Sequence, residues 1–310
     1  MAQDVHAGGP AHAAGLHTGD ILKSVKGRPI LPPEQPTFAM GADWSLAIQR
    51  GIQNLTLPVV VPMPRSRRQP YCEPDAVSAS RLDGNVGYLK VSIFPGLLGL
   101  GVARDIDAAV AELSSCDRLI IDLRGHLGGG LGVLRLMSYL TPNKMPIGYT
   151  LSRKRAESGY QKENLRKLDK LPTHLPNPLA IASMALRFGG RDSSVVLMSE
   201  GLGPQKWHGH IAILVNEHTV SAGEMVAAFA AENGLATIVG TETAGRLIPG
   251  SGTKAGEGYM LIMPRAEYIT WQGHRFEGRG IEPNVRAHQI RDERCGNGDS
   301  VVEVARATLN

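Results

Sequence analysis

From residue 85 onward, short apolar runs alternate with segments that carry apolar residues at helical spacing. The runs are rich in Val, Ile and Leu, which is typical of strands buried on both faces of a parallel sheet. The segments between them read as amphipathic helices. This alternation predicts an α/β layer fold. The expected strands are 86–94, 118–123, 211–218 and 236–240, and the expected helices are 102–113, 131–140 and 222–233.

The first 63 residues follow a different pattern, with small residues, Gly-centred turns and two longer segments. We expect a helix over 43–50 and an apolar strand over 55–62, which together make a small α+β unit. Residues 64–84 open with a polar, basic, proline-punctuated stretch typical of a linker. The expected domains are therefore 1–63, a linker over 64–84, and an α/β core over 85–290.

Three later segments depart from the alternation. Residues 152–206 include a charged, proline-rich stretch with poor periodicity, which predicts an inserted surface helix or lid rather than sheet. Residues 259–270 and 275–283 read as two late strands joined by a turn at Gln272-Gly273. We expect 291–310 to form a C-terminal tail helix.

The composition is that of a soluble globular chain, since 42% of the 310 residues are hydrophobic and 20% are charged. These values exclude the charge-rich signature of disorder and the apolar excess of a membrane protein. No apolar run is long enough to cross a bilayer, and the first residues show no export signal. The 37 Gly and 20 Pro indicate many tight turns.

The charge balance is slightly basic, with 33 Lys and Arg against 29 Asp and Glu. Basic residues cluster at Arg65, Arg67 and Arg68 and again at 153–155. Few aromatic residues lie among them, so solvated loops are the favoured interpretation and no nucleic-acid partner is expected.

The cysteines and the paired histidines give no metal site. Cys72, Cys116 and Cys295 lack the spacing of a zinc site and form an odd set, so structural thiols are expected. His208 and His210 have no third ligand nearby in the sequence. We therefore expect no metal and no cofactor.

Ser221 lies between an expected buried strand and an expected helix. The free N–H groups at a helix N-terminus favour developing negative charge, so this is a suitable place for a nucleophile. The same pattern also fits a helix N-cap, with Glu224 completing a capping box. The local sequence by itself favours the cap.

A glycine-rich segment at 122–130 forms a second junction between strand and helix. Its glycines would let backbone N–H groups approach a phosphate or form an oxyanion hole. Val133 stands where the dinucleotide fingerprint needs its last glycine, so the nucleotide interpretation is weak. Ser251 and Lys254 satisfy S-x-x-K, but a turn follows instead of the required helix, and chance explains this match better.

Taken together, these segments resemble the C-terminal processing peptidases, also called tail-specific proteases. The matching motifs are ordered and cover most of the chain: a PDZ segment at 8–30, an entry strand at 84–94, a D-L-R-x-N-x-G-G loop at 118–130, the nucleophile helix and following strand at 215–245, and a closing G-I-x-P-D-V at 278–285. The resemblance implies a PDZ module, here without its first strand, joined to a ClpP/crotonase-like α/β core.

Matched position by position, Ser221 falls on the family's nucleophile. The backbone N–H groups of Gly128 and Ala222 fall on its oxyanion donors. Arg246 falls on the family's Lys, which acts as the general base in the bacterial branch. Because Arg stays protonated in proteins, Arg246 cannot replace that base and is expected to stabilise charge or structure.

The general base remains open between three hypotheses. The tricorn-core branch uses a Ser-His dyad supported by a late Glu, and Glu277 resembles that Glu, so our first hypothesis is a His upstream of this chain, oriented by Glu277. The second hypothesis is that Lys254 takes over as the base. The third uses His126 or His218, each of which fits a solvated loop histidine equally well.

The leading function is a serine endopeptidase that acts on polypeptides, engaged through their C-termini by the PDZ module. A peptidase-like scaffold that lost its base and only binds peptide or an apolar ligand is the second hypothesis, and a crotonase-type acyl-CoA enzyme is the third. The resemblance implies an extracytoplasmic location for a full-length form. The sequence leaves the oligomeric state open.

Overall fold

The computed structural model describes residues 2, 5, 9–31, 38–63, 75–96, 99–170, 192–256, 259–288 and 299–309. The chain divides into two compact units. The first comprises 1–75 with 289–300, and the second comprises 76–288 with 301–310. We call them the N-terminal unit and the core unit.

The N-terminal unit is built on a four-stranded antiparallel sheet in the order β2-β1-β3-β4. Its small apolar centre contains Leu46, Ile48 and Val59. The elements are α1 (Pro10–Ala13), β1 (Ile21–Val25), β2 (Arg28–Pro29), β3 (Ala42–Arg50) and β4 (Gln53–Val61).

The helix predicted over 43–50 is wrong, because these residues form most of β3. Trp44, Leu46 and Ile48 alternate with polar or small neighbours, and this period of two suits a strand with one buried face. Residues Ala42–Arg50 pair along their whole length with Gln53–Val61. The tertiary pairing therefore overrides the helix start suggested by the local sequence.

A buried ion pair stabilises the turn before β1. Asp20 is 1% exposed and accepts hydrogen bonds from the Arg50 Nε and Nη2 atoms at 2.8 and 2.7 Å. Burial by itself would raise the pKa of this carboxyl, but the hydrogen bonds from Arg50 and the His17 N–H, together with the Arg50 charge, outweigh it and hold the pKa below its usual value. This contact ties the chain around Gly19-Asp20 to the end of β3.

The core unit contains a six-stranded sheet in the order β16-β12-β11-β7-β6-β5. Only the β5–β6 pair is antiparallel. The linker predicted over 64–84 is therefore too long, since 77–82 form β5 at the edge of this sheet. The strands are β5 (Val77–Leu82), β6 (Val86–Val91), β7 (Arg118–Asp122), β11 (Ile211–Val215), β12 (Thr237–Gly240) and β16 (Val285–Arg286).

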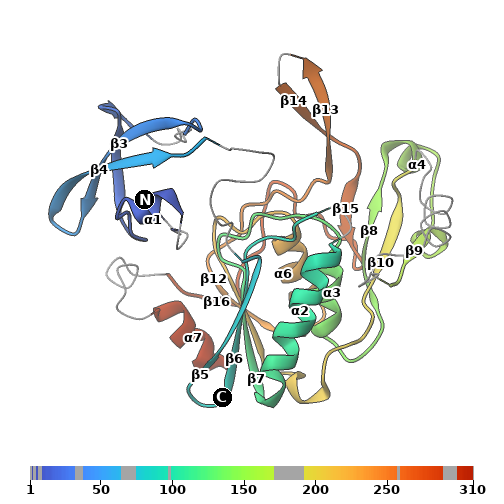
Figure 1. Ribbon diagram of the computed structural model, residues 1–310. Helices are drawn as coiled ribbons and strands as arrows, with labels where there is room; N and C mark the ends of the chain where they lie inside the picture. Colours follow the sequence, from blue (N-terminus) through green and yellow to red (C-terminus); the bar gives the residue numbers. More distant parts are fainter. Residues whose placement is uncertain are drawn as a thin grey trace. The chain divides into compact units, whose positions relative to one another are not determined.

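Helices cover both faces of this sheet, with α2, α3 and α6 on one face and α7 on the other (Figure 1). Alternate strand residues enter the two layers: Ile213 packs toward the first group, whereas Ile120 and Leu214 pack toward α7. The helices are α2 (Leu100–Glu112), α3 (Val133–Tyr139), α6 (Ala222–Glu232) and α7 (Ser300–Thr308). Short 3₁₀ turns span Leu113–Ser115, Lys162–Asn164 and Gln205–Trp207.

A second four-stranded sheet has the order β15-β8-β10-β9 and takes two strands from the predicted insertion. Part of 152–206 is therefore sheet, contrary to the expectation of a surface helix or lid alone, because β9 and β10 pair in parallel. Residues 171–191 lie outside the described part. The elements are β8 (Pro146–Leu151), α4 (Arg153–Glu157), β9 (Arg166–Leu168), β10 (Val195–Met198) and β15 (Glu267–Thr270).

The prediction of two late strands over 259–270 and 275–283 is correct for most of the first segment and wrong for the second. Residues 259–264 form β14 (Tyr259–Pro264), which pairs with β13 (Gly250–Gly256). The next strand, β15, pairs with β8, and 275–283 run as turns toward β16. A turn does exist at Gln272-Gly273, where the Gly273 N–H donates to the Thr270 carbonyl oxygen. The local turn signal was correct, but it did not identify the partner strand.

Candidate active site

Ser221 stands at the start of α6, just after the loop that follows β11. Its backbone has φ 54° and ψ −115°, the conformation of the first central residue in a mirror-image type II turn. Glycine normally occupies such a position, and a residue with a Cβ pays about 1–3 kcal/mol to adopt it. A strained strand-to-helix turn of this kind exposes the serine hydroxyl of many hydrolases.

Glu224 holds this turn in place. Its side chain is fully buried and accepts four hydrogen bonds. One carboxylate oxygen accepts from the Ser221 N–H at 2.9 Å and the Arg246 N–H at 2.8 Å. The other accepts from the Gly245 N–H and the Thr243 hydroxyl, both at 2.6 Å. The Glu224 half of the predicted capping box is thus present, and the same carboxylate also fixes the segment 243–246.

The glycine-rich loop lies directly against Ser221. Gly128 has φ +84°, and a Cβ added there would lie 2.8 Å from the Ser221 Cβ and 3.2 Å from its Oγ. Gly129 is equally constrained, since its Cβ would lie 2.1 Å from the Phe94 carbonyl oxygen. The junctions after β7 and β11 meet because these strands are parallel neighbours, with Asp122 opposite Leu214.

His126 lies inside this loop and is fully buried. Its Nδ1 atom accepts a hydrogen bond from the Gly128 N–H at 2.9 Å. Burial lowers the pKa of His126 to about 4, so the ring is neutral at pH 7. A group that releases its proton at so low a pH is a weak base near neutrality, which argues against the base role considered for His126.

Arg246 reaches the Ser221 turn through its backbone. Its carbonyl oxygen accepts from the Ser221 N–H at 3.0 Å, in addition to the bond from its own N–H to Glu224. The Arg246 residue is exposed. The position matched to the family's Lys is therefore next to Ser221, and it carries a permanent positive charge.

Glu277 clamps the chain just beyond Arg246. One of its carboxylate oxygens accepts from the Leu247 N–H at 2.5 Å and from the Ile248 N–H at 2.9 Å. The Gly278 N–H also donates to the Gly245 carbonyl oxygen at 2.8 Å. Within the described residues, the Glu277 side chain thus accepts hydrogen bonds from the backbone N–H groups of Leu247 and Ile248.

The two remaining base candidates are exposed. Lys254 lies on β13, and no recorded hydrogen bond or ion pair joins it to Ser221 in the described residues. His218 lies three residues before Ser221, with its Nε2 atom 3.4 Å from a Glu217 carboxylate oxygen. The structure thus brings together Ser221, Gly128, Ala222 and the Arg246 backbone, and it leaves Lys254 on a separate hairpin.

Sequence reasoning missed most of the Glu224 network. The capping-box spacing indicated one hydrogen bond between Glu224 and Ser221, but the partners near Thr243 come from a segment about twenty residues away. It also missed Phe94, whose N–H donates to the Gly128 carbonyl oxygen at 2.9 Å. No local pattern reveals either partner, because both depend on which strands are neighbours.

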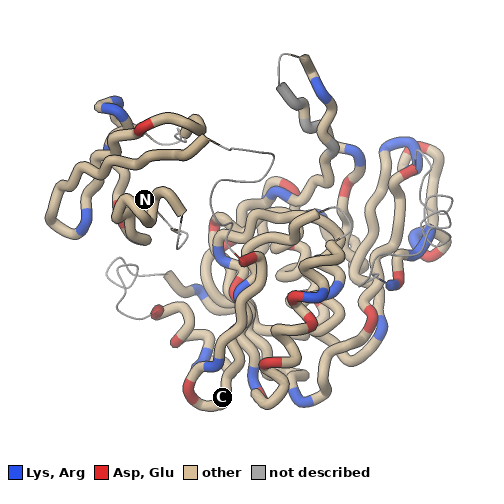
Figure 2. The backbone as a smooth tube through the Cα atoms, in the orientation of Figure 1, with Lys and Arg blue, Asp and Glu red and all other residues tan. Residues whose placement is uncertain are grey.

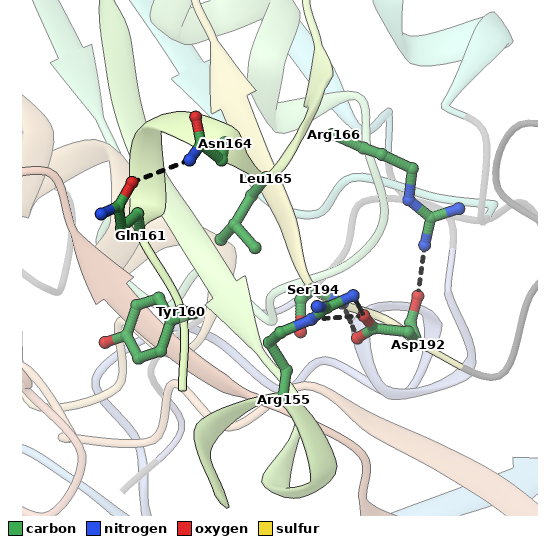
Figure 3. A pocket seen from close by; sticks show the side chains of 8 residues that line it. All are labelled: Arg155, Tyr160, Gln161, Asn164, Leu165, Arg166, Asp192 and Ser194. Carbon is green, nitrogen blue, oxygen red and sulfur yellow. Dashed lines mark hydrogen bonds and ion pairs between the residues drawn. The ribbon is translucent and has the colours of Figure 1, made fainter. Parts of the chain in front are cut away.

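A separate cavity of about 260 Å³ lies beside the second sheet (Figure 3). Asp192 occupies one side and receives hydrogen bonds from Arg155. The volume is small compared with pockets that enclose organic ligands, and no predicted site residue lines it. The lining residues are Arg155, Tyr160, Gln161, Asn164, Leu165, Arg166, Asp192 and Ser194.

The remaining sequence candidates are placed as follows. His208 and His210 are exposed, and the described residues contain no cluster of three or more potential metal ligands. Cys116 is a buried free thiol, whereas Cys72 and Cys295 lie outside the described residues. No helix in the described ranges has the length and apolarity that a bilayer crossing requires.

The basic cluster at 153–155 lies on α4 among acidic partners. Arg153 bonds Glu157, and Arg155 bonds Asp192. Figure 2 shows Lys and Arg interspersed with Asp and Glu along the core unit. Residues 65, 67 and 68 of the other cluster lie outside the described part.

A strained serine at a helix start, facing a glycine-rich loop at the carboxyl ends of parallel strands, is an arrangement used by serine hydrolases. Comparison with known proteins identifies the group: residues 85–287 match peptidase family S41. The chain belongs to this family of serine peptidases.

Curated relatives have the names expected from the sequence motifs. The chain is 25% identical to carboxyl-terminal-processing peptidase 3 of Arabidopsis thaliana, over 90% of this chain and 49% of the relative. It is also 25% identical to a carboxyl-terminal-processing protease of Synechocystis, over 91% of this chain and 58% of the relative. The chain therefore spans about half the length of the curated relatives it matches.

Solved structures share the fold at low sequence identity. The photosystem II D1 C-terminal processing protease aligns with a TM-score of 0.53 at 16% identity, covering 98% of this chain and 70% of that protein. Mature CPAF aligns with a TM-score of 0.53 at 15% identity, covering 96% and 77%. These matches support the mixed α/β architecture.

Proposed function

We propose that this chain is a serine peptidase of the C-terminal processing type, with Ser221 as the nucleophile. The strained turn at Ser221, at the start of α6, lies directly against Gly128 of the glycine-rich loop. This contact is the observation that supports the proposal most directly. Strain of this kind persists only where surrounding contacts hold it, and here Glu224 supplies them.

In the proposed reaction, the Ser221 Oγ forms a bond to the scissile carbonyl carbon, and its proton passes through a base to the departing amine. Water then hydrolyses the acyl-enzyme ester and releases the new carboxyl end. The Ala222 N–H lies at the first helical position, where no intrahelical acceptor exists, and can donate to the oxyanion. The positive charge of Arg246 favours the same developing charge.

The general base is the part of this proposal that needs assignment by experiment. Arg246 is excluded by its permanent charge. The lowered pKa of His126 and the Gly128 N–H bound to its Nδ1 atom both argue against that residue. Lys254→Ala and His218→Ala each test one exposed candidate, because loss of the base would lower acylation of Ser221 by at least about a hundredfold. If both variants retain the rate of the parent protein, neither residue is the base. The hypothesis of an upstream histidine oriented by Glu277 then predicts faster acylation in a form extended at its N-terminus.

We propose polypeptide substrates engaged through their C-terminal ends by the N-terminal unit acting as a PDZ-like module. In that unit β4 (Gln53–Val61) is an edge strand of the described sheet, so a peptide strand can pair with it. A peptide with a free C-terminus should then bind more tightly than its C-terminal amide, as measured by fluorescence anisotropy. Equal affinities would contradict this mode.

The nucleophile is tested by covalent labelling with a fluorophosphonate. We expect labelling in the native chain, none in Ser221→Ala, and undiminished labelling in Ser251→Ala, which removes the serine of the S-x-x-K match. Peptide mapping by mass spectrometry locates the adduct. Labelling at another serine would contradict the assignment.

A binding protein without catalysis is the second candidate function. Two observations favour it: the Gly128 N–H is occupied by His126, and an arginine stands at the family's Lys position. Comparing this chain with a form extended at its N-terminus separates the candidates. If Ser221 reacts in neither form while peptide still binds, the scaffold is a binder.

A further inference from the structure

The imidazole of His126 fills the space between the glycine-rich loop and the first turn of α6. The ring is 0% exposed and packs against Phe94, with ring centroids 4.8 Å apart. The ring also leaves no room for a side chain at Gly223 of α6, because a Cβ added there would lie 2.9 Å from the His126 Nδ1 atom. The Val220 N–H donates to the His126 carbonyl oxygen at 3.0 Å, so both its backbone and its side chain touch the serine junction.

The hydrogen bond from the Gly128 N–H fixes the tautomer of this ring. A nitrogen that accepts a hydrogen bond has no proton of its own, so the proton of neutral His126 lies on Nε2. The Nε2 atom is buried and has no hydrogen-bond partner in the described part of the protein. Burial of the unpaired Nε2–H group costs desolvation free energy, while Nδ1 accepts the hydrogen bond from the Gly128 N–H.

This bond uses the N–H that matches the family's oxyanion donor. Gly128 lies against Ser221, but its N–H points back into its own loop toward His126. Two more hydrogen bonds fasten the loop to Phe94, from the Phe94 N–H to the Gly128 oxygen at 2.9 Å and from the Gly130 N–H to the Phe94 oxygen at 2.8 Å. The two expected oxyanion donors are thus in different states. The Gly128 N–H already has an acceptor, whereas the Ala222 N–H has no hydrogen-bond acceptor among the described residues.

We propose that His126 is a positioning residue that withholds the Gly128 N–H from the oxyanion hole, so that the structure represents a resting state of the site. The inference rests on the proposed peptidase function and concerns its regulation. Release requires that the imidazole turn away or that Gly128 reorient. The oxyanion that forms on the substrate's carbonyl oxygen when Ser221 attacks competes for this N–H, because a charged acceptor binds an N–H about twice as strongly as a neutral one.

Two substitutions at His126 separate withholding from simple support of the loop. His126→Asn keeps an acceptor, because the Asn Oδ1 is bonded to the same Cγ position as the His Nδ1 and can accept from the N–H two residues later. His126→Leu has a similar volume and no acceptor. The two variants are compared with each other, and circular dichroism confirms that each is folded.

The first measurement is hydrogen exchange of the Gly128 amide, which does not depend on activity. We expect exchange about tenfold faster in His126→Leu than in His126→Asn, because one hydrogen bond is missing. The second is the rate of fluorophosphonate labelling of Ser221, in whichever form of the protein is labelled. We expect labelling about tenfold faster in His126→Leu, because the freed N–H stabilises the attacked centre.

Three outcomes would overturn the inference, and they differ in what else they affect. Equal Gly128 exchange in the native protein and in His126→Leu would show that the hydrogen bond is absent in solution. Slower labelling of His126→Leu would show that the bond supports the reactive loop instead of withholding a donor. Absence of Ser221 labelling in every form would overturn the proposed peptidase function and this inference with it, whereas the first two outcomes leave the function standing.

Discussion

Ser221, the proposed nucleophile, has a backbone conformation that its own side chain disfavours. The strain predicts that removing the Cβ stabilises the fold. Ser221→Gly should therefore have a higher unfolding free energy than Ser221→Ala, by about 1 kcal/mol after the larger chain entropy of glycine is counted. Urea denaturation of the two variants measures this difference. Equal stability would show that the strain in the turn is no larger than the entropy cost of glycine.

His126 predicts a specific pH dependence of stability. Burial holds its pKa at about 4 in the folded protein, against a reference value of 6.5 in the unfolded chain. As the pH falls below about 6.5, His126 becomes protonated in the unfolded chain but stays neutral in the folded protein. The free energy of unfolding therefore decreases. Between pH 7 and pH 4.5 this loss amounts to about 2–3 kcal/mol.

The His126→Asn variant isolates this contribution, since asparagine does not titrate. Chemical denaturation of both proteins at pH 7, 5.5 and 4.5 should show that the native protein loses more stability than the variant as the pH falls. Parallel pH profiles would contradict a buried neutral His126. The experiment needs no assumption about catalysis.

At the scale of elements, the site depends on two segments that Glu224 joins, helix α6 and the chain at 243–246. In Glu224→Gln, an amide NH₂ replaces one acceptor oxygen, and two buried donors lose their partner. We expect this to lower the unfolding free energy by about 3 kcal/mol. The exposed Glu163→Gln should change it by less than about 0.5 kcal/mol. A small effect at Glu224 would mean that the two segments are held together by other contacts.

The elements also show what the sequence predicts and what it does not. The alternation after residue 85 located the central strands β6, β7, β11 and β12 because both their faces are apolar. The helix expected at 43–50 was wrong. The prediction gave more weight to a local helix-start signal than to the alternation of apolar and polar residues, which extends over only nine residues here. The second late strand, expected at 275–283, was wrong because a turn signal does not show whether the chain after it finds a partner strand.

For the site, the sequence motifs placed Ser221, Gly128 and Arg246 in one hypothesis, and the structure brings these positions together. The motifs did not indicate that the Gly128 N–H is occupied. That contact depends on the direction in which a buried ring points, which is set by packing against Phe94 and Gly223. Side-chain direction of this kind has no counterpart in residue spacing.

At the scale of the whole molecule, the core unit contains all the residues of the candidate site, and the N-terminal unit contains the edge strand β4 on which we propose that peptides bind. The family assignment covers 85–287 and therefore concerns the core unit alone. Catalysis and peptide capture are thus separate proposals. The Ser221→Ala variant should lose the first and retain the second.

We propose Ser221 as the nucleophile, and mass spectrometry after fluorophosphonate treatment shows whether its hydroxyl reacts. We expect one adduct, on the peptide that contains Ser221, and its loss in Ser221→Ala but not in Ser251→Ala. The contradicting result is a folded protein that binds peptide yet gives no adduct at Ser221, either in this chain or in a form extended at its N-terminus.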